Sequence, residues 1–148
     1  MVQPEDMGSF KFLEHTGDAY IEAYGKSLSE AFANSALAMF EVMTDTSKVE
    51  PKIEESVEVE GHDLESLLYS WLETLLVRCD VENRLYSRFI VEISDDEGEH
   101  IYLRAKIYGE DYDPERHISK TEVKAVTFHM MEIKFLEGYW RLRFLLDL

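Results

Sequence analysis

A short polar segment near the start of the chain carries residue types suited to chemistry. Residues 14–18 read Glu-His-Thr-Gly-Asp and separate two short apolar runs, residues 10–13 and 19–23. A tight turn between strands needs a small residue such as Gly17, but it needs neither a histidine nor an aspartate. Because Asp18 begins the second run, a rigid strand would hold its carboxylate, which is a suitable oxygen ligand for a hard cation. The alternative is structural, with these polar side chains bonding only to local backbone N–H groups.

The C-terminal residues offer a second set of oxygen ligands. The sequence ends on Leu-Leu-Asp-Leu, and this apolar ending predicts that the terminus is tied into a sheet. Asp147 and the terminal carboxylate of Leu148 would then supply the oxygens that Ca²⁺, Mg²⁺ or Mn²⁺ accept. If the last strand pairs near the first hairpin, Asp18 and Asp147 could share one cation. The alternative is that Asp147 forms an ion pair with Arg141 or Arg143 on its own strand.

Histidines could also take part in chemistry, but their spacing matches no known site. His129 follows Thr127 on the polar face of a predicted strand, where it could ligate a metal, shuttle a proton or form a surface hydrogen bond. The chain has no P-loop, nucleotide-binding glycine fingerprint, zincin motif or serine nucleophile elbow. These absences argue against a self-contained catalyst. None of the five histidines has zinc-site spacing: His15, His62, His100, His117 and His129.

Two helices are predicted between the first hairpin and the later strands. Ser27 and Glu30 form a capping-box pattern ahead of apolar residues at helical spacing, which predicts a helix over about residues 28–44. Asp63 is a good N-cap for a second helix, whose buried face includes Cys79 as a packed, inert thiol. The predicted apolar face of this second helix also contains Leu64, Leu67, Leu68, Trp71 and Leu75.

The remaining sequence predicts strands that alternate between apolar and polar residues. Residues 53–60, 89–93 and 101–108 show this alternation. On a later strand, Val126, Phe128 and Met130 are expected on the apolar face, opposite Thr127 and His129. The fold class predicted is α+β, with two amphipathic helices packed on one face of a largely antiparallel β-sheet. Residues 8–148 would form a single domain, and residues 1–7 a flexible N-terminal extension.

Composition limits the classes of partner. The 148-residue chain is 45% hydrophobic and carries a net charge of −16, all of it within residues 1–100. So acidic a surface repels phosphate backbones, which disfavours direct nucleic-acid binding and favours a basic protein partner or cations, although solubility alone could explain it. One cysteine and no membrane-spanning run predict a soluble cytoplasmic protein without membrane contact.

Together these segments resemble the archease family along nearly the whole chain, from Phe10 to Leu148. The first match is residues 14–18, where the family usually has His-Thr-Ala-Asp, so that Gly17 replaces alanine and should loosen the turn. In the third match the family commonly has tyrosine in place of Phe128. The four matching segments occur in order at residues 14–18, residues 27–32, residues 113–117 with 122–129, and residues 146–148.

The resemblance implies an accessory protein and not an enzyme. Archeases activate the GTP-dependent RNA ligase of the RtcB type in tRNA splicing. They promote guanylylation of the ligase, support multiple turnover and broaden its nucleotide specificity. The family's metal-binding positions match Asp18, Asp147 and Leu148, with Ca²⁺ the usual ion and Mg²⁺ or Mn²⁺ as other candidates. Supporting or partner-contact roles fall to His15, Lys124 and His129.

Two other functions remain open from the sequence. A small metal-dependent hydrolase could use Asp18, His15, His129 and Asp147 to activate water on a cation. A general chaperone, or a modulator of other nucleic-acid-processing proteins, would expose an apolar patch. The oligomeric state is not predicted.

Overall fold

The computed structural model describes residues 8–13, 17–96 and 99–148. The predicted N-terminal extension, residues 1–7, therefore lies outside the described residues. Two helices, one short 3-10 turn and seven strands follow one another within these ranges. In chain order they are β1 (Phe10–Leu13), β2 (Asp18–Gly25), α1 (Leu28–Met43), η2 (Thr46–Lys48), β3 (Ile53–Gly61), α2 (Leu64–Glu82), β4 (Arg84–Asp96), β5 (His100–Asp111), β6 (Ala125–Leu136) and β7 (Tyr139–Asp147).

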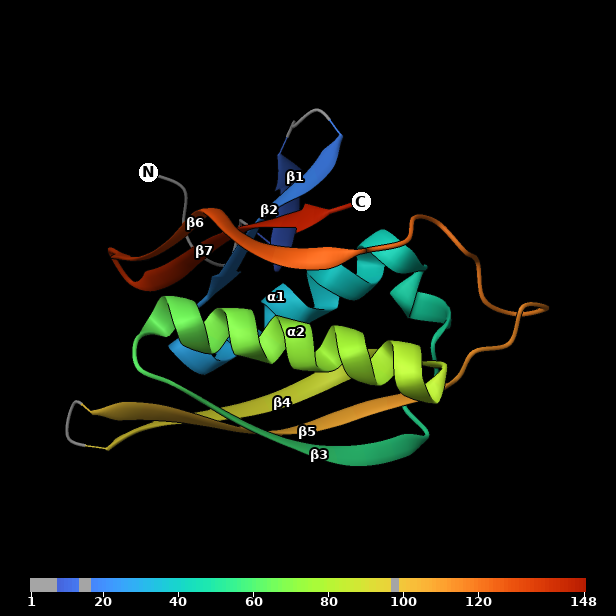
Figure 1. Ribbon diagram of the computed structural model, residues 1–148, viewed down its shortest axis with the longest axis horizontal. Helices are drawn as coiled ribbons and strands as arrows, with labels where there is room; N and C mark the ends of the chain where they lie inside the picture. Colours follow the sequence, from blue (N-terminus) through green and yellow to red (C-terminus); the bar gives the residue numbers. More distant parts are fainter. Residues whose placement is uncertain (1–7, 14–16, 97–98) are drawn as a thin grey trace.

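The strands form two antiparallel sheets with the two helices between them (Figure 1). One sheet has the order β1-β2-β7-β6 and the other the order β3-β5-β4. Helix α1 packs on both β2 and β4, and α2 packs on both β6 and β3, so each helix contacts both sheets. The predicted α+β class and antiparallel pairing are confirmed. The strands were expected in one sheet but divide between two. Alternation marks which face of a strand is buried, but it does not indicate which strands are its neighbours.

Helix α1 begins and ends close to the predicted residues. The Ser27 side chain accepts a hydrogen bond from the backbone N–H of Glu30, which satisfies one of the free donors of the first turn. The Thr44 backbone N–H bonds to the carbonyl of Phe40 and closes the last turn. The buried face carries mostly small and aromatic residues, namely Ala31, Phe32, Ser35, Ala36, Ala38, Met39 and Phe40.

Helix α2 has a complete capping box at its start. Asp63 accepts from the backbone of Ser66, and the Ser66 hydroxyl accepts from the backbone of Asp63. Its Trp71 indole N–H donates to the carbonyl of Phe32 at 3.0 Å, which joins the two helices inside the core. Burial raises the pKa of the Cys79 thiol to about 11, as expected for an inert cysteine. Within the described residues, neither this helix nor α1 is long and apolar enough to cross a membrane.

Close backbone packing between β4 and β5, in the β3-β5-β4 sheet, requires one glycine. Strand β4 carries a bulge between Tyr86 and Arg88, opposite β5. A Cβ atom on Gly109 would lie 1.8 Å from the carbonyl oxygen of Leu85. Only a residue without a side chain therefore fits at this position of β5.

Candidate functional site

The candidate site is at one end of the β1-β2-β7-β6 sheet, where β2 begins and β7 ends. These strands pair antiparallel, and Asp18 stands directly opposite Asp147. Directly opposed residues project from the same face of a sheet with Cβ atoms about 4.5–5.5 Å apart. The last strand thus pairs with the first hairpin, which was the condition for a shared cation, and the pairing brings together the two carboxylates that the sequence singled out.

Neither arginine of β7 neutralises Asp147. Arg141 pairs with Glu132 at 2.8 Å, and Arg143 pairs with Glu22 at 2.6 Å. The structural alternative for Asp147 is therefore wrong. Asp147 is exposed, and within the described part of the chain it makes no ion pair.

Lys124 lies beside Asp147, just before β6. Its backbone N–H donates to the carbonyl oxygen of Asp147 at 2.8 Å. The next residue, Ala125, is the register partner of Asp147 on the β6 side. Three strands of the sheet thus meet at this end, with the exposed side chain of Lys124 at its edge. Leu148 follows Asp147 and is half-buried against the core.

The set of candidate ligands fits a hard cation, although the set contains only a few oxygen atoms. Asp18, Asp147 and a main-chain oxygen of Leu148 offer only oxygen, the ligand atom that Ca²⁺, Mg²⁺ and Mn²⁺ prefer. In residues 8–13, 17–96 and 99–148, no three His, Cys, Asp or Glu side chains gather closely enough to hold a metal ion. A cation held by the two aspartates would keep coordination positions for water or for a partner's oxygen atoms.

The histidines are less well placed than the aspartates to ligate a cation. His15 lies outside the described residues. His129 is exposed and sits within an irregular part of β6, four residues along the chain from Ala125. Its backbone N–H donates to the hydroxyl of Thr127 at 2.9 Å. The metal-ligand set of the hydrolase alternative, with His129 joining both aspartates, is not assembled by the described side chains.

The predicted alternation on β6 is wrong at two residues. Val126 is buried as expected, but Phe128 is 54% exposed and Met130 is 43% exposed. The ladder with β7 is regular at Thr127 and resumes at Glu132, so residues 128–131 stand opposite a single residue of β7. This β6 bulge interrupts the two-residue period on which the prediction depended.

The burial of Glu22 was not predicted from the sequence. It is 4% exposed and accepts hydrogen bonds from Tyr24 and from Arg143. Burial would raise the pKa of Glu22, but these hydrogen bonds and the charge of Arg143 outweigh it and hold the pKa below its usual range. Alternation along β2 could have placed Glu22 on the face opposite Ile21, but only the cross-strand partner explains its burial.

The polar segment at residues 113–117 has a structural role. The His117 ring accepts from the backbone N–H of Asp113 at its Nδ1, so its Nε2–H donates to the Glu110 carboxylate at 3.0 Å. Glu110 also accepts from the backbone of Glu50 and from Arg116. Burial would raise the pKa of Glu110, but these donors lower it to about 2. The cluster fastens the loop before β6, and thereby Lys124, to the body of the protein.

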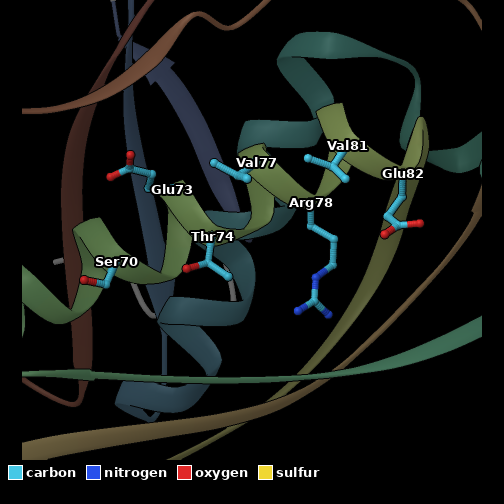
Figure 2. Close-up of a pocket in the computed structure, with 7 residues that line it drawn as sticks. All are labelled: Ser70, Glu73, Thr74, Val77, Arg78, Val81 and Glu82. Atoms are coloured by element: carbon cyan, nitrogen blue, oxygen red, sulfur yellow. The ribbon is translucent and has the colours of Figure 1, made fainter.

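A shallow hollow of about 490 Å³ runs along the outer side of α2 (Figure 2). Arg78, the one basic residue among the described residues that line it, is directed to the carbonyl of Ser56 and to Glu55. No histidine or cysteine occurs in the described part of its lining, so the hydroxyls of Ser70 and Thr74 have no histidine base beside them. The lining residues are Ser70, Glu73, Thr74, Val77, Arg78, Val81 and Glu82.

Comparison with known proteins gives a consistent family. The model of the archease protein family matches residues 10–148. The chain is 49% identical to the protein archease of Sulfurisphaera tokodaii over 142 residues, which cover 96% of this chain and 100% of that protein. It is 47% identical to the protein archease of Pyrococcus furiosus over 143 residues, again covering 96% of this chain and 100% of the relative.

Solved structures agree with this comparison. A solution structure of a Methanobacterium thermoautotrophicum protein has a TM-score of 0.85 and 48% identity, and it covers 96% of this chain and 100% of the other. A crystal structure of a Thermotoga maritima archease, described as a possible chaperone, has a TM-score of 0.57 over 93% of this chain and 96% of the other. At 17% identity, that second structure is similar in fold alone.

Proposed function

This chain belongs to the archease family, and from that premise we propose that it is an accessory protein of a GTP-dependent RNA ligase of the RtcB type. It promotes guanylylation of the ligase and multiple turnover, and it broadens the choice of nucleotide. It performs no catalysis of its own. The observation that carries the proposal is the pairing of Asp18 with Asp147 at one end of a sheet.

The carboxylate pair supports a role for a divalent cation. Asp18 and Asp147 hold the cation, and a main-chain oxygen of Leu148 contributes a third ligand. When bound, the cation supplies positive charge that an incoming acidic or phosphate oxygen can coordinate. The protein's own part is to fix the two carboxylates on rigid strands and to hold Lys124 next to Asp147.

The charge of the chain supports a protein partner over RNA. A net charge of −16 repels a phosphate backbone and attracts the basic surface that an RNA-binding enzyme must have. The acidic protein can therefore approach the ligase without competing for its RNA, and the attraction raises the rate of encounter.

The test is guanylylation of the cognate ligase, followed as covalent transfer of labelled GMP with and without this protein. We expect the wild-type protein to accelerate adduct formation, and Asp18→Asn and Asp147→Asn to lose that effect. Asp80→Asn removes an exposed carboxylate from α2 and serves as the matched control, with full activation expected. Equal activation by all four proteins would eliminate the role of the carboxylate pair, and no activation by the wild type would eliminate the ligase proposal.

A further inference from the structure

The β6 bulge (residues 128–131) interrupts the regular pairing of β6 with β7 in the β1-β2-β7-β6 sheet. Thr127 pairs with Leu145 and Glu132 pairs with Arg143, so four residues of β6 stand opposite Phe144 alone. Within it, Met130 adopts a φ of +61°, which is unfavourable for a residue with a side chain. Such strain persists only where the surroundings impose it, and it is concentrated at functional positions.

The bulge presents two large apolar side chains to solvent. Phe128 is 54% exposed and Met130 is 43% exposed, although regular alternation would have buried both. An exposed aromatic ring does not contribute the stabilisation that its burial in the core would give the fold. Aromatic residues, phenylalanine included, are enriched in protein–protein interfaces relative to the rest of the surface.

Neighbouring groups hold the bulge in one conformation. The Phe128 ring stacks on Tyr69 of α2, with ring centroids 4.3 Å apart and planes 12° apart. The Tyr69 hydroxyl is hydrogen-bonded to Glu73, and this bond raises the pKa of Tyr69. From the other side, the Tyr20 hydroxyl donates to the carbonyl of Met130 at 2.9 Å. Because the ring is already ordered, little conformational entropy is lost when a partner covers it.

The charge around the bulge indicates the chemistry of that partner. Helix α2, on which Phe128 rests, carries Glu65, Glu73, Asp80 and Glu82 against the single base Arg78. The bulge is also adjacent to the candidate cation site, since Asp147 lies two residues beyond Leu145 on β7. The complementary surface is an apolar pocket with lysine or arginine at its rim. A second copy of this chain does not fit, because each copy carries a net charge of −16.

We propose that the β6 bulge is the anchor by which this protein docks on its RNA ligase, with Phe128 entering an apolar pocket that has a basic rim. This inference rests on the proposed function and adds the surface through which it acts. Docking there would bring Asp18, Asp147 and Lys124 to the same partner surface, because all lie at the adjoining end of the sheet.

The test is the dissociation constant of the complex between the intact protein and the ligase, measured by calorimetry for wild type and variants. We expect Phe128→Ala to weaken binding about 10-fold or more, as truncation of an aromatic anchor does. Phe128→Tyr keeps the stacked ring and should bind like wild type. Phe135→Ala is the matched control, because Phe135 is a phenylalanine of the same strand, 60% exposed, and lies outside the bulge; its effect should stay within about 2-fold.

A second variant protects the test against misfolding of Phe128→Ala. Met130→Lys keeps the side chain exposed and places a positive charge against the basic rim, so it should also weaken binding about 10-fold. Equal affinities of the wild type, Phe128→Ala and Met130→Lys would overturn the docking inference and leave the ligase proposal intact. A wild-type protein that neither binds the ligase nor stimulates its guanylylation would overturn both.

Discussion

Asp18 and Asp147 face one another across the β2–β7 ladder, although 128 residues separate them in the chain. Two like charges directly opposed on a sheet destabilise it by a few tenths to about 1 kcal/mol unless a counter-charge is present. Neither Arg141 nor Arg143 supplies that counter-charge to Asp147, since both pair with other carboxylates. A bound divalent cation would turn this repulsion into a stabilising contact.

Asp147→Asn tests that relationship through stability. In the presence of a chelator, the variant should be more stable than wild type by about 0.2–1 kcal/mol, because one of the two opposed charges is gone. Millimolar Ca²⁺ should raise the Tm of wild type and leave the Tm of the variant nearly unchanged, because a ligand stabilises only the folded state that binds it. Thermal unfolding with and without Ca²⁺ measures both effects. The same Ca²⁺-dependent rise in the two proteins would place the cation elsewhere.

Glu110→Gln tests the cluster that fastens the loop before β6. The folded pKa of Glu110, about 2, is below the ordinary 4.5, so its carboxylate stabilises the fold above pH 4.5 and loses that effect as the pH falls towards 2. The variant should therefore be less stable than wild type at pH 7, by about 1.5–3 kcal/mol for hydrogen bonds to a charged group. The difference should disappear near pH 2.

Chemical denaturation across this pH range measures the Glu110→Gln effect. Glu58→Gln is the matched control, because Glu58 lies on the outer face of β3 with its side chain 71% exposed. A constant difference between wild type and Glu110→Gln from pH 7 to pH 2 would show that the ionised carboxylate contributes nothing.

Trp71→Phe tests the contact between the helices. The substitution removes the indole N–H that reaches Phe32 and leaves part of a fully buried site empty. We expect a loss of about 2–4 kcal/mol in the free energy of unfolding. Trp140→Phe changes a half-buried tryptophan of β7 and should cost less than about 1 kcal/mol. Equal losses for the two variants would contradict the role given to the indole hydrogen bond.

Gly109→Ala and Gly138→Ala separate steric overlap from backbone strain. A Cβ at Gly109 would overlap the carbonyl oxygen of Leu85, and backbone atoms cannot move away cheaply, so this variant should lose about 3 kcal/mol or more. Gly138 has a φ of +86° with open space around it, and its variant should lose only about 1 kcal/mol. Urea denaturation ranks the two losses, and the reverse order would refute this reading of the β4–β5 packing.

Local signals in the sequence predicted the elements well. Ser27 and Asp63 are N-caps as predicted, and the α+β class with antiparallel pairing is confirmed. These features depend on a few neighbouring residues, which a sequence displays directly. The division of the strands between two sheets depends on contacts between distant segments, which alternation does not encode.

The residues of the candidate site could be predicted only in part, because local composition is visible in the sequence and contacts between distant segments are not. The composition of the two segments pointed to Asp18 and Asp147, and the register confirms that they are opposed. The exposure of Phe128 and Met130 was missed, because a bulge shifts the register without a glycine or proline to mark it. The burial of Glu22 and Glu110 was missed because their partners, Arg143 and Glu50, come from distant parts of the chain.

RNA ligation by the cognate ligase at large substrate excess is the measurement that tests the central claim most directly. The assay compares ligase alone, ligase with the wild-type protein and ligase with Asp147→Asn, each with GTP and then with ATP. We predict that many turnovers occur only with the wild-type protein, that the wild type also permits ATP to be used, and that the variant leaves the ligase near a single turnover. Turnover and nucleotide choice that stay the same in all three mixtures would contradict the account.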